Sequence, residues 1–245
     1  MKKHVIYLIS ALLIASGSLF GQKQFYFGVS GMGLNTWVTN QNNYGLPFEM
    51  DYAIAIGGGA NANIGFDFSK HFGLKIEVGF ERLGQTYKDD LFNDTTYTRN
   101  VSLNYLEVPL LFKYRTSGKV VRFCVLAGPQ FNFLMSAKQK YYKLGKTDED
   151  YIYDKDDKPV KVGEETITDR YTSLDVLGRL DLGVDITLVK NLFLNAGLTR
   201  AYGFLDVNAT NMRIADHTGN YNASHNILVG INFGINYAIP LGAKK

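Results

Sequence analysis

The chain has 245 residues and a formal net charge of +3, so it is long enough for one domain and its charge gives no reason to expect a nucleic-acid partner. Its composition combines 16 Tyr, 16 Phe and 25 Gly with only 5 Pro, which favours strands joined by turns over packed helices. Its single cysteine, Cys124, excludes an intramolecular disulfide.

The first segment of the chain has the pattern of a secretory signal peptide. A basic start at 1–4 precedes an apolar run at 5–15, and small and polar residues follow at 16–22. The alternative, a membrane anchor helix, is disfavoured because serine and glycine interrupt the run, whereas a spanning helix needs ~20 apolar residues. We therefore expect 1–22 to be a cleaved signal peptide and 23–245 to be one domain, either soluble beyond the inner membrane or crossing a membrane as a barrel.

Alternation of apolar and polar residues runs through eight segments of the remaining chain. At 72–84, for example, Leu74, Ile76 and Val78 alternate with Lys75 and Glu77. Because successive side chains of a strand point to opposite faces, each segment predicts a strand with one apolar face and one polar face. In chain order the segments are 24–35, 52–68, 72–84, 98–115, 120–136, 174–188, 192–206 and 226–239.

The connections between these segments alternate in length. The short ones are 69–71, 116–119 and 190–191, and the longer ones are 36–51, 89–97, 138–172 and 207–224. This alternation places all the long connections at one end. The prediction is an all-β fold, an eight-stranded antiparallel up-and-down transmembrane β-barrel in the outer membrane, with both termini in the periplasm and the long loops outside.

The character of the two faces favours a membrane barrel over a soluble one. The polar faces are rich in Gly, Asn and Asp, which suit a narrow lumen, and the apolar faces carry bulky Leu, Ile, Val and Phe. Aromatic residues near strand ends are typical of the girdles at the two membrane interfaces: Tyr52, Phe68, Phe72, Tyr114 and Tyr237. The alternatives are a soluble ligand-binding barrel with its apolar face inside and a β-sandwich.

Two irregularities interrupt the pattern. In 98–115 the apolar parity shifts between Tyr105 and Leu106, which indicates a bulge or a strand end leaving the bilayer. In 192–206, Arg200 falls on the otherwise apolar face. Because a cation on the lipid face costs ~2–4 kcal/mol at the bilayer midplane and little near an interface, we expect Arg200 near the rim.

Charged residues of both signs share the inward parity, in near balance. An eight-stranded barrel leaves an interior just wide enough for side chains, and buried charges must be paired. We therefore expect a structural network that fills the interior, the alternative being a path for ions or solutes. The network is predicted to contain Lys75, Glu77, Glu81, Glu107, Lys113, Arg122, Arg179, Asp181 and Asp185.

Other residues that could carry chemistry are interpreted as structural or solvated. Asp216 and His217, with Ser224 and His225, lie in or beside the last long loop, but no nucleophile motif accompanies them, so no catalytic residue is predicted. Cys124 has inward parity and is expected to be an inert, buried thiol.

The loop 138–172 carries carboxylate clusters at 148–150 and 154–157. Such clusters can bind calcium, but the glycine and the terminal glutamate of an EF-hand are missing, and basic residues nearly balance the acidic ones. No metal or cofactor is therefore predicted. Tyrosines in the same loop motivate the hypothesis that it contacts another protein at the cell surface.

Three stretches carry a family resemblance. NYLEVPLLFKYR at 104–115, LAGPQFNFLMSA at 126–137 and GFDFSKHFGLKIEVG at 65–79 resemble the PorT-like outer-membrane β-barrel family in chain order. The chain departs from the common aromatic ending, since it continues past Tyr237 to Lys245. The resemblance implies an outer-membrane barrel, and the role of the founding member in secretion across the outer membrane implies one candidate function.

The resulting functional prediction is a non-enzymatic, monomeric outer-membrane barrel with a structural or interaction role, accessory to protein secretion or envelope assembly. Its expected partners are outer-membrane lipid and, through loop 138–172, another envelope or secretion protein. The alternative is a surface adhesin or ligand-binding barrel that acts through loops 138–172 and 207–224. A narrow pore and an enzyme at the rim are further alternatives.

Overall fold

The computed structural model describes residues 23–40, 51–91, 95–144, 151–153, 159–161, 164–213, 215 and 219–241. The expected signal peptide at 1–22 and the pair Asp216 and His217 lie outside these residues, as do parts of the long connections.

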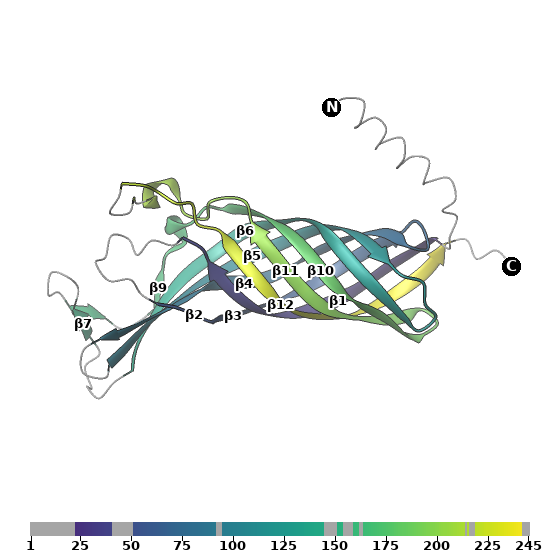
Figure 1. Ribbon diagram of the computed structural model, residues 1–245, viewed down its shortest axis with the longest axis horizontal. Coiled ribbons are helices and arrows are strands. Elements are labelled where there is room, and N and C mark those ends of the chain that lie inside the picture. The colour runs from purple at the N-terminus through teal and green to yellow at the C-terminus, as the bar shows by residue number, and fades with distance from the viewer. Residues whose placement is uncertain are drawn as a thin grey trace, which may run out of the picture.

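The described chain folds into a closed antiparallel barrel (Figure 1). Each barrel strand pairs with its neighbours in the chain, and the first pairs with the last, from Lys23 with Leu241 to Val38 with Asn226. This closure confirms the eight-stranded barrel expected from the alternation. Its strands are β1 (Lys23–Val38), β3 (Ala55–Asp67), β4 (Phe72–Leu91), β5 (Thr95–Arg115), β6 (Val121–Leu144), β10 (Leu174–Val189), β11 (Leu192–Gly203) and β12 (Asn226–Leu241).

Shorter elements lie beyond the barrel wall. They are β2 (Asp51–Ala53), β7 (Tyr151–Tyr153), β8 (Pro159–Lys161), β9 (Glu164–Thr166) and two 3₁₀ turns, η2 (Thr168–Arg170) and η3 (Thr210–Met212). Strand β2 pairs with β4, β9 pairs with β6, and β7 pairs with β8.

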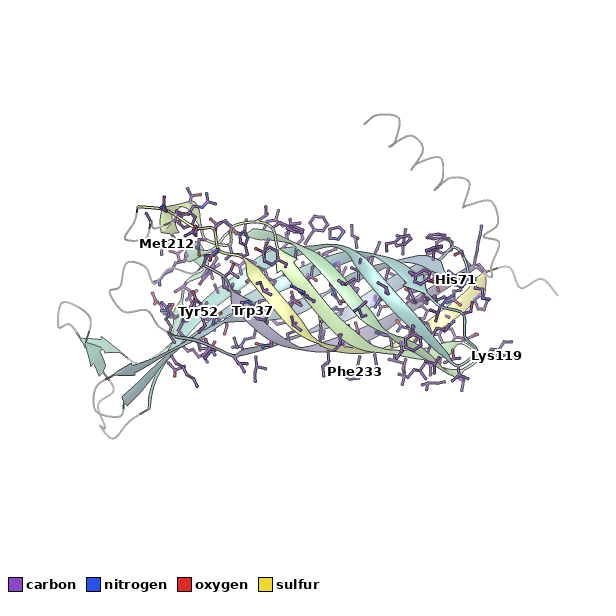
Figure 2. All side chains as sticks on the ribbon, in the orientation of Figure 1. Trp37, Tyr52, His71, Lys119, Met212 and Phe233 are labelled. Atoms are coloured by element: carbon purple, nitrogen blue, oxygen red, sulfur yellow. The ribbon has the colours of Figure 1, made fainter. Side chains whose placement is uncertain are left out.

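The short connections all lie at one end of the barrel, the end at which β1 begins and β12 ends (Figure 1). Figure 2 places His71 and Lys119 there, and Trp37, Tyr52 and Met212 toward the opposite end. The first short turn is closed by Ser69, whose hydroxyl accepts hydrogen bonds from the backbone N–H of His71 (3.2 Å) and Phe72 (2.8 Å). The predicted segregation of short and long connections is confirmed.

The outward face of the barrel is apolar. Side chains such as Leu198 (60% exposed) and Phe123 (67% exposed) project from it, while charged side chains such as Glu77 and Arg179 point inward and are buried. Aromatic pairs lie near the short-turn end, with ring centroids 5.5 Å apart for Phe72 and Tyr114 and 5.9 Å apart for Phe27 and Tyr237. An apolar exterior around a charged interior is the arrangement of a lipid-facing barrel and excludes the soluble alternative.

Both irregularities have structural counterparts. The register of β5 against β6 shifts between Asn104 and Tyr105, one residue before the predicted position. The inward parity of β5 nevertheless continues through Leu103, Tyr105 and Glu107, which are all buried, so the apolar residues change face because the interior itself becomes apolar toward the outer end. Arg200 is exposed on the outward face of β11, three residues before the strand ends.

Two expected loops contain strands. Strands β4 and β5 leave only 92–94 between them, so 89–97 is the end of a hairpin, and β6 continues to Leu144 into the segment 138–172, which also contains β7, β8, β9 and η2. The alternation ends in these extensions because consecutive residues are polar, as at 88–90 and 138–140. Thr and Tyr, which favour strands, carry the extension of β5 at Thr95–Thr98.

Candidate functional site in the barrel interior and at its outer end

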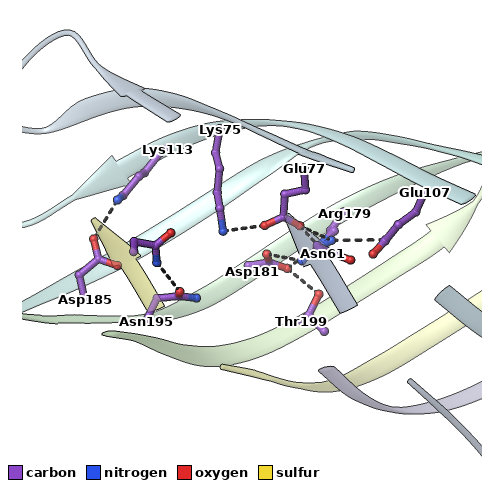
Figure 3. A network of polar contacts seen from close by, with 11 residues as sticks. Asn61, Lys75, Glu77, Glu107, Lys113, Arg179, Asp181, Asp185, Asn195 and Thr199 are labelled. Carbon is purple, nitrogen blue, oxygen red and sulfur yellow. Dashed lines mark hydrogen bonds and ion pairs between the residues drawn. The ribbon is translucent and has the colours of Figure 1, made fainter. Parts of the chain in front are cut away.

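Arg179 of β10 is the centre of the interior polar network (Figure 3). Its guanidinium lies 3.0 Å from Glu77 Oε2 and 3.7 Å from Glu107 Oε2, and it donates two hydrogen bonds of 2.9 Å to the carboxylate of Asp181. Lys75 Nζ lies 2.6 Å from Glu77 Oε1. All five side chains are buried, so one cation holds together carboxylates from three different strands.

A second cluster occupies the short-turn end of the interior. Lys113 Nζ donates to Asp185 Oδ2 at 2.8 Å, and Arg115 Nη1 lies 2.8 Å from Asp67 Oδ2. The Lys113 ammonium also lies 4.8 Å from the centre of the Tyr26 ring, a cation–π contact. Each charge in this cluster therefore has an opposite partner on another strand.

Toward the outer end, amides replace cations as the partners of the carboxylates. Glu81 accepts hydrogen bonds from Gln130 (2.8 Å) and Asn132 (3.0 Å). Asn226 donates to Asp175 (2.8 Å) and to the Tyr105 hydroxyl (3.1 Å). The Tyr105 ring belongs to a buried apolar cluster that fills this end of the barrel: Met32, Leu34, Val38, Leu83, Tyr87, Val101, Leu103, Tyr105, Ala137, Ile167, Tyr171, Leu177, Ala201, Val207 and Leu228.

The nine residues of the predicted network all lie on the inward side. Seven of them make the ion pairs above, Glu81 binds amides, and Arg122 donates to the Thr187 hydroxyl at 3.3 Å near the short turns. The predicted network did not include Asp67, Arg115 and Asp175. Each of them is buried and lies on the inward side near the end of a strand. The cavity beside Arg179 and Asp181 has a volume of about 20 Å³, which holds roughly one water molecule.

The connection between β11 and β12 is organised by Asp206. Its carboxylate accepts hydrogen bonds from the backbone N–H of Asn208 (3.2 Å) and Ser224 (3.1 Å) and from the Tyr221 hydroxyl (2.7 Å), and it lies 2.9 Å from Arg213 Nε. Four contacts on one carboxylate fix this loop at the rim.

The side chains considered for rim catalysis have other partners. The Ser224 hydroxyl is buried and accepts from Asn208 Nδ2 at 2.9 Å. His225 Nδ1 lies 3.0 Å from the Leu205 carbonyl oxygen, and the ring stacks on Tyr202 with centroids 5.6 Å apart. Cys124 is buried and faces inward, as expected. Within the described residues, no group of three His, Cys, Asp or Glu could hold a metal ion.

Strand β9 docks on the extended edge of β6 through ion pairs. Glu164 lies 2.5 Å from Lys138 Nζ and 2.7 Å from Lys140 Nζ, and Ile167 N–H donates to the Ala137 carbonyl at 2.9 Å. The hydrogen bonds from Lys138 and then Lys140 lower the pKa of Glu164 from its ordinary 4.5 to about 2. Because this pKa is depressed, the ionised carboxylate stabilises the docking of β9 on β6 fully above pH 4.5. This stabilisation is lost as the pH falls toward 2.

Replacing Glu164 with glutamine is expected to weaken the docking of β9 on β6 at neutral pH, because both lysines lose their anionic partner. Amide hydrogen exchange of Ile167 should then be faster than in the wild type, and the wild type should show the same acceleration below the ordinary pKa of the carboxyl. Glu165→Gln is the matched control, since Glu165 pairs with Arg170 instead. Equal exchange in Glu164→Gln and wild type would show that the ion pairs do not hold the strand.

Comparison with solved structures shows similar barrels at low sequence identity. A major outer membrane protein from Thermus thermophilus aligns over 88% of this chain and 99% of its own, with 16% identity and a TM-score of 0.44. OprG from Pseudomonas aeruginosa aligns over 92% and 99%, with 9% identity and a TM-score of 0.41. The attachment invasion locus protein Ail of Yersinia pestis aligns over 89% and 100%, with 10% identity and a TM-score of 0.37. No curated protein matches the sequence.

Among the described residues, no helix is long and apolar enough to cross a membrane. Residues 20–209 match the family described as "Outer membrane protein beta-barrel domain", which is more than half of the chain. The match agrees with the apolar exterior, the charged interior and the closed strand order. The chain therefore belongs to the outer membrane protein beta-barrel domain family, and its place is the outer membrane.

Proposed function

We propose that this protein is a non-enzymatic interaction protein of the outer membrane, which binds a partner through the sheet that β4, β5 and β6 form beyond the barrel. The carrying observation is the length of these strands, 20, 21 and 24 residues, against 16 for β1 and 12 for β11. A tilted strand crosses a bilayer in ~9–11 residues. The outer ends of these long strands therefore lie beyond the membrane, and Figure 1 shows them continuing past the barrel at the lower left.

The outer sheet is braced in a way that suits binding. Its backbone pairing continues to Leu91 with Thr95 and to Thr96 with Leu144, and the Arg99 guanidinium lies 4.3 Å from the centre of the Tyr87 ring. A surface that is ordered before it binds loses less conformational entropy in the complex.

The filled interior supports an interaction role over a pore. Ion pairs, amides and the apolar cluster occupy successive levels of the lumen. We expect the reconstituted protein to produce no unitary current steps in planar bilayers, measured beside a general porin as a positive control. Regular steps of one size in several preparations would instead favour the narrow pore.

The class of partner is proposed from the PorT-like stretches and from the chemistry of the sheet. The resemblance implies a protein of the envelope or of a secretion complex, and a surface ligand bound in the manner of an adhesin is the second candidate. The sheet carries Lys138 and Lys140 beside Glu164, so it pairs already with an acidic extended segment of its own chain. The barrel closes without a second copy, which supports a monomer in the membrane.

Site-specific photo-crosslinking in cells of the source organism tests this proposal. A photoreactive residue at Asn100, in the outer sheet, is expected to give a defined protein adduct, whereas one at Lys119, in a short turn at the opposite end, serves as the control. Deleting 145–163, which leaves β9 in place, should reduce the adduct while the barrel keeps its heat-dependent gel mobility. Adducts from Lys119 alone would move the interaction to the periplasmic side and contradict the proposal.

A further inference from the structure

A groove of about 600 Å³ opens between β1 and β2 near the outer end of the barrel. It forms because the strand pairing changes there. The last pair between β1 and β3 is Thr36 with Ala55, whereas β2 pairs only with β4, up to Ala53 with Thr86. Beyond Thr36, no described strand pairs with the β3 side of β1.

Gln85 of β4 seals this opening from the inside. The backbone N–H of Val38 donates to Gln85 Oε1 at 3.1 Å, and Gln85 Nε2 donates to the Ala53 carbonyl oxygen at 3.3 Å. One buried amide thus takes the place of the missing backbone pairs. The groove therefore faces the outside of the barrel and has a polar floor that is already hydrogen-bonded.

The walls of the groove are aromatic and aliphatic. Trp37, Tyr52 and Ile54 line it, and Tyr52 is 58% exposed and Ile54 74% exposed. Figure 2 places Trp37 and Tyr52 beside each other on the outer part of the barrel. Trp and Tyr at this height are typical of the membrane interface. Thr39 and Asn40 form a polar border.

A stretch of small residues lies below the groove on the outward face, beyond the exposed pair Asn35 and Ile56. Gly33 pairs with Gly58 and Gly31 with Ala60, so small residues lie side by side on β1 and β3. A Cβ atom at Gly31 would have its nearest neighbour at 3.7 Å, and one at Gly33 at 4.0 Å, and neither glycine has a positive φ. Packing within the chain therefore does not require these two glycines.

We propose that the groove and the small residues below it hold one acyl chain of an outer-membrane lipid. The surface around them is the lipid-facing surface of the barrel, with Phe80 (47% exposed) and Ile231 (48% exposed) on the flanking strands β4 and β12, so the groove is continuous with an interface that lipid already covers. Its volume is within the ~300–1,000 Å³ of typical ligand pockets. This site is independent of the outer sheet and of any protein partner.

Trp37 is the only tryptophan of the chain, which makes it a reporter inside the proposed site. The full mature protein in detergent micelles is titrated with phosphatidylcholine whose acyl chains carry bromine, a quencher of tryptophan emission. A bound chain predicts quenching that saturates near one lipid per protein. The reference is Phe233→Trp in a Trp37→Phe background, which reports lipid at an ordinary position of the lipid face (Figure 2).

Asn35→Phe fills the groove from its outward side, and Leu198→Phe adds the same ring to the lipid face of β11 as a matched control. Asn35→Phe is expected to abolish the saturable quenching and Leu198→Phe to preserve it, with heat-dependent gel mobility as the check that both barrels fold. The proposal is overturned by quenching of Trp37 that rises without saturation as at position 233, or by unchanged saturation in Asn35→Phe. Absence of quenching at Trp37 while the tryptophan at position 233 is quenched also overturns it, because the groove is then covered by protein.

Discussion

Arg179→Met is expected to lower the free energy of unfolding of the barrel by about 3–5 kcal/mol, the usual cost of removing one partner of a buried ion pair. Methionine keeps much of the volume of arginine but leaves the carboxylates of Glu77, Glu107 and Asp181 without their shared cation in the buried interior. The loss is expected at the upper end of this range because three carboxylates then repel one another.

The measurement is urea unfolding of the protein folded into phosphatidylcholine vesicles, followed by the emission of Trp37. Arg213→Met is the matched control, because Arg213 pairs with Asp206 at the partly exposed rim and such pairs contribute only ~0–1 kcal/mol. Adding Glu77→Gln to Arg179→Met should recover part of the loss. If Arg179→Met does not change the unfolding midpoint, the ion pairs of Arg179 do not stabilise the barrel.

Tyr105→Ala is expected to cost about 3–5 kcal/mol, the range found when a large aromatic side chain is removed from a packed core. The Tyr105 ring is buried in the apolar cluster at the outer end, and its hydroxyl accepts a hydrogen bond from Asn226. Tyr105→Phe keeps the ring and loses only that hydrogen bond, so it should cost about 0.5–1.5 kcal/mol.

The same unfolding assay separates the two contributions of Tyr105. If Tyr105→Phe is as destabilising as Tyr105→Ala, the hydroxyl and not the ring would be the main contribution, and the outer cluster would not act as a hydrophobic core. Bilayer recordings of Tyr105→Ala should remain silent, because the cluster around Arg179 still fills the next level of the lumen.

The membrane-spanning part of each strand was predictable from the sequence, because lipid and lumen impose opposite chemistry on alternate residues, as at Leu74 and Lys75. The outer extensions of β4, β5 and β6 were not. At 83–87 of β4 five consecutive residues are buried, since Gln85 seals the groove and Thr86 is covered from outside, so no alternation marks the strand. The break at Ile54 between β2 and β3 was also not predictable from the sequence. The outward apolar residues Tyr52, Ile54 and Ile56 continue the alternation across it.

For the interior, the alternation along each strand predicted which charged side chains face inward but not which of them form ion pairs. Arg179 contacts Glu77, about a hundred positions earlier in the sequence, and that pairing depends on the registers of several strand pairs between them. Asp67 and Arg115 illustrate the same point, because they become partners only where two neighbouring hairpins end at one level.

The pairing of β1 with β12 has a consequence for the biogenesis of this protein. The two strands that complete the wall are the first and the last to be synthesised, and they share sixteen residue pairs. Until the final strand arrives, every partial sheet has two edges whose backbone groups have no partners, which hydrocarbon does not tolerate. A nascent chain of this protein must therefore stay out of the bilayer core until it is complete, and a truncation near its carboxyl end should be a target for envelope proteases and not a smaller barrel.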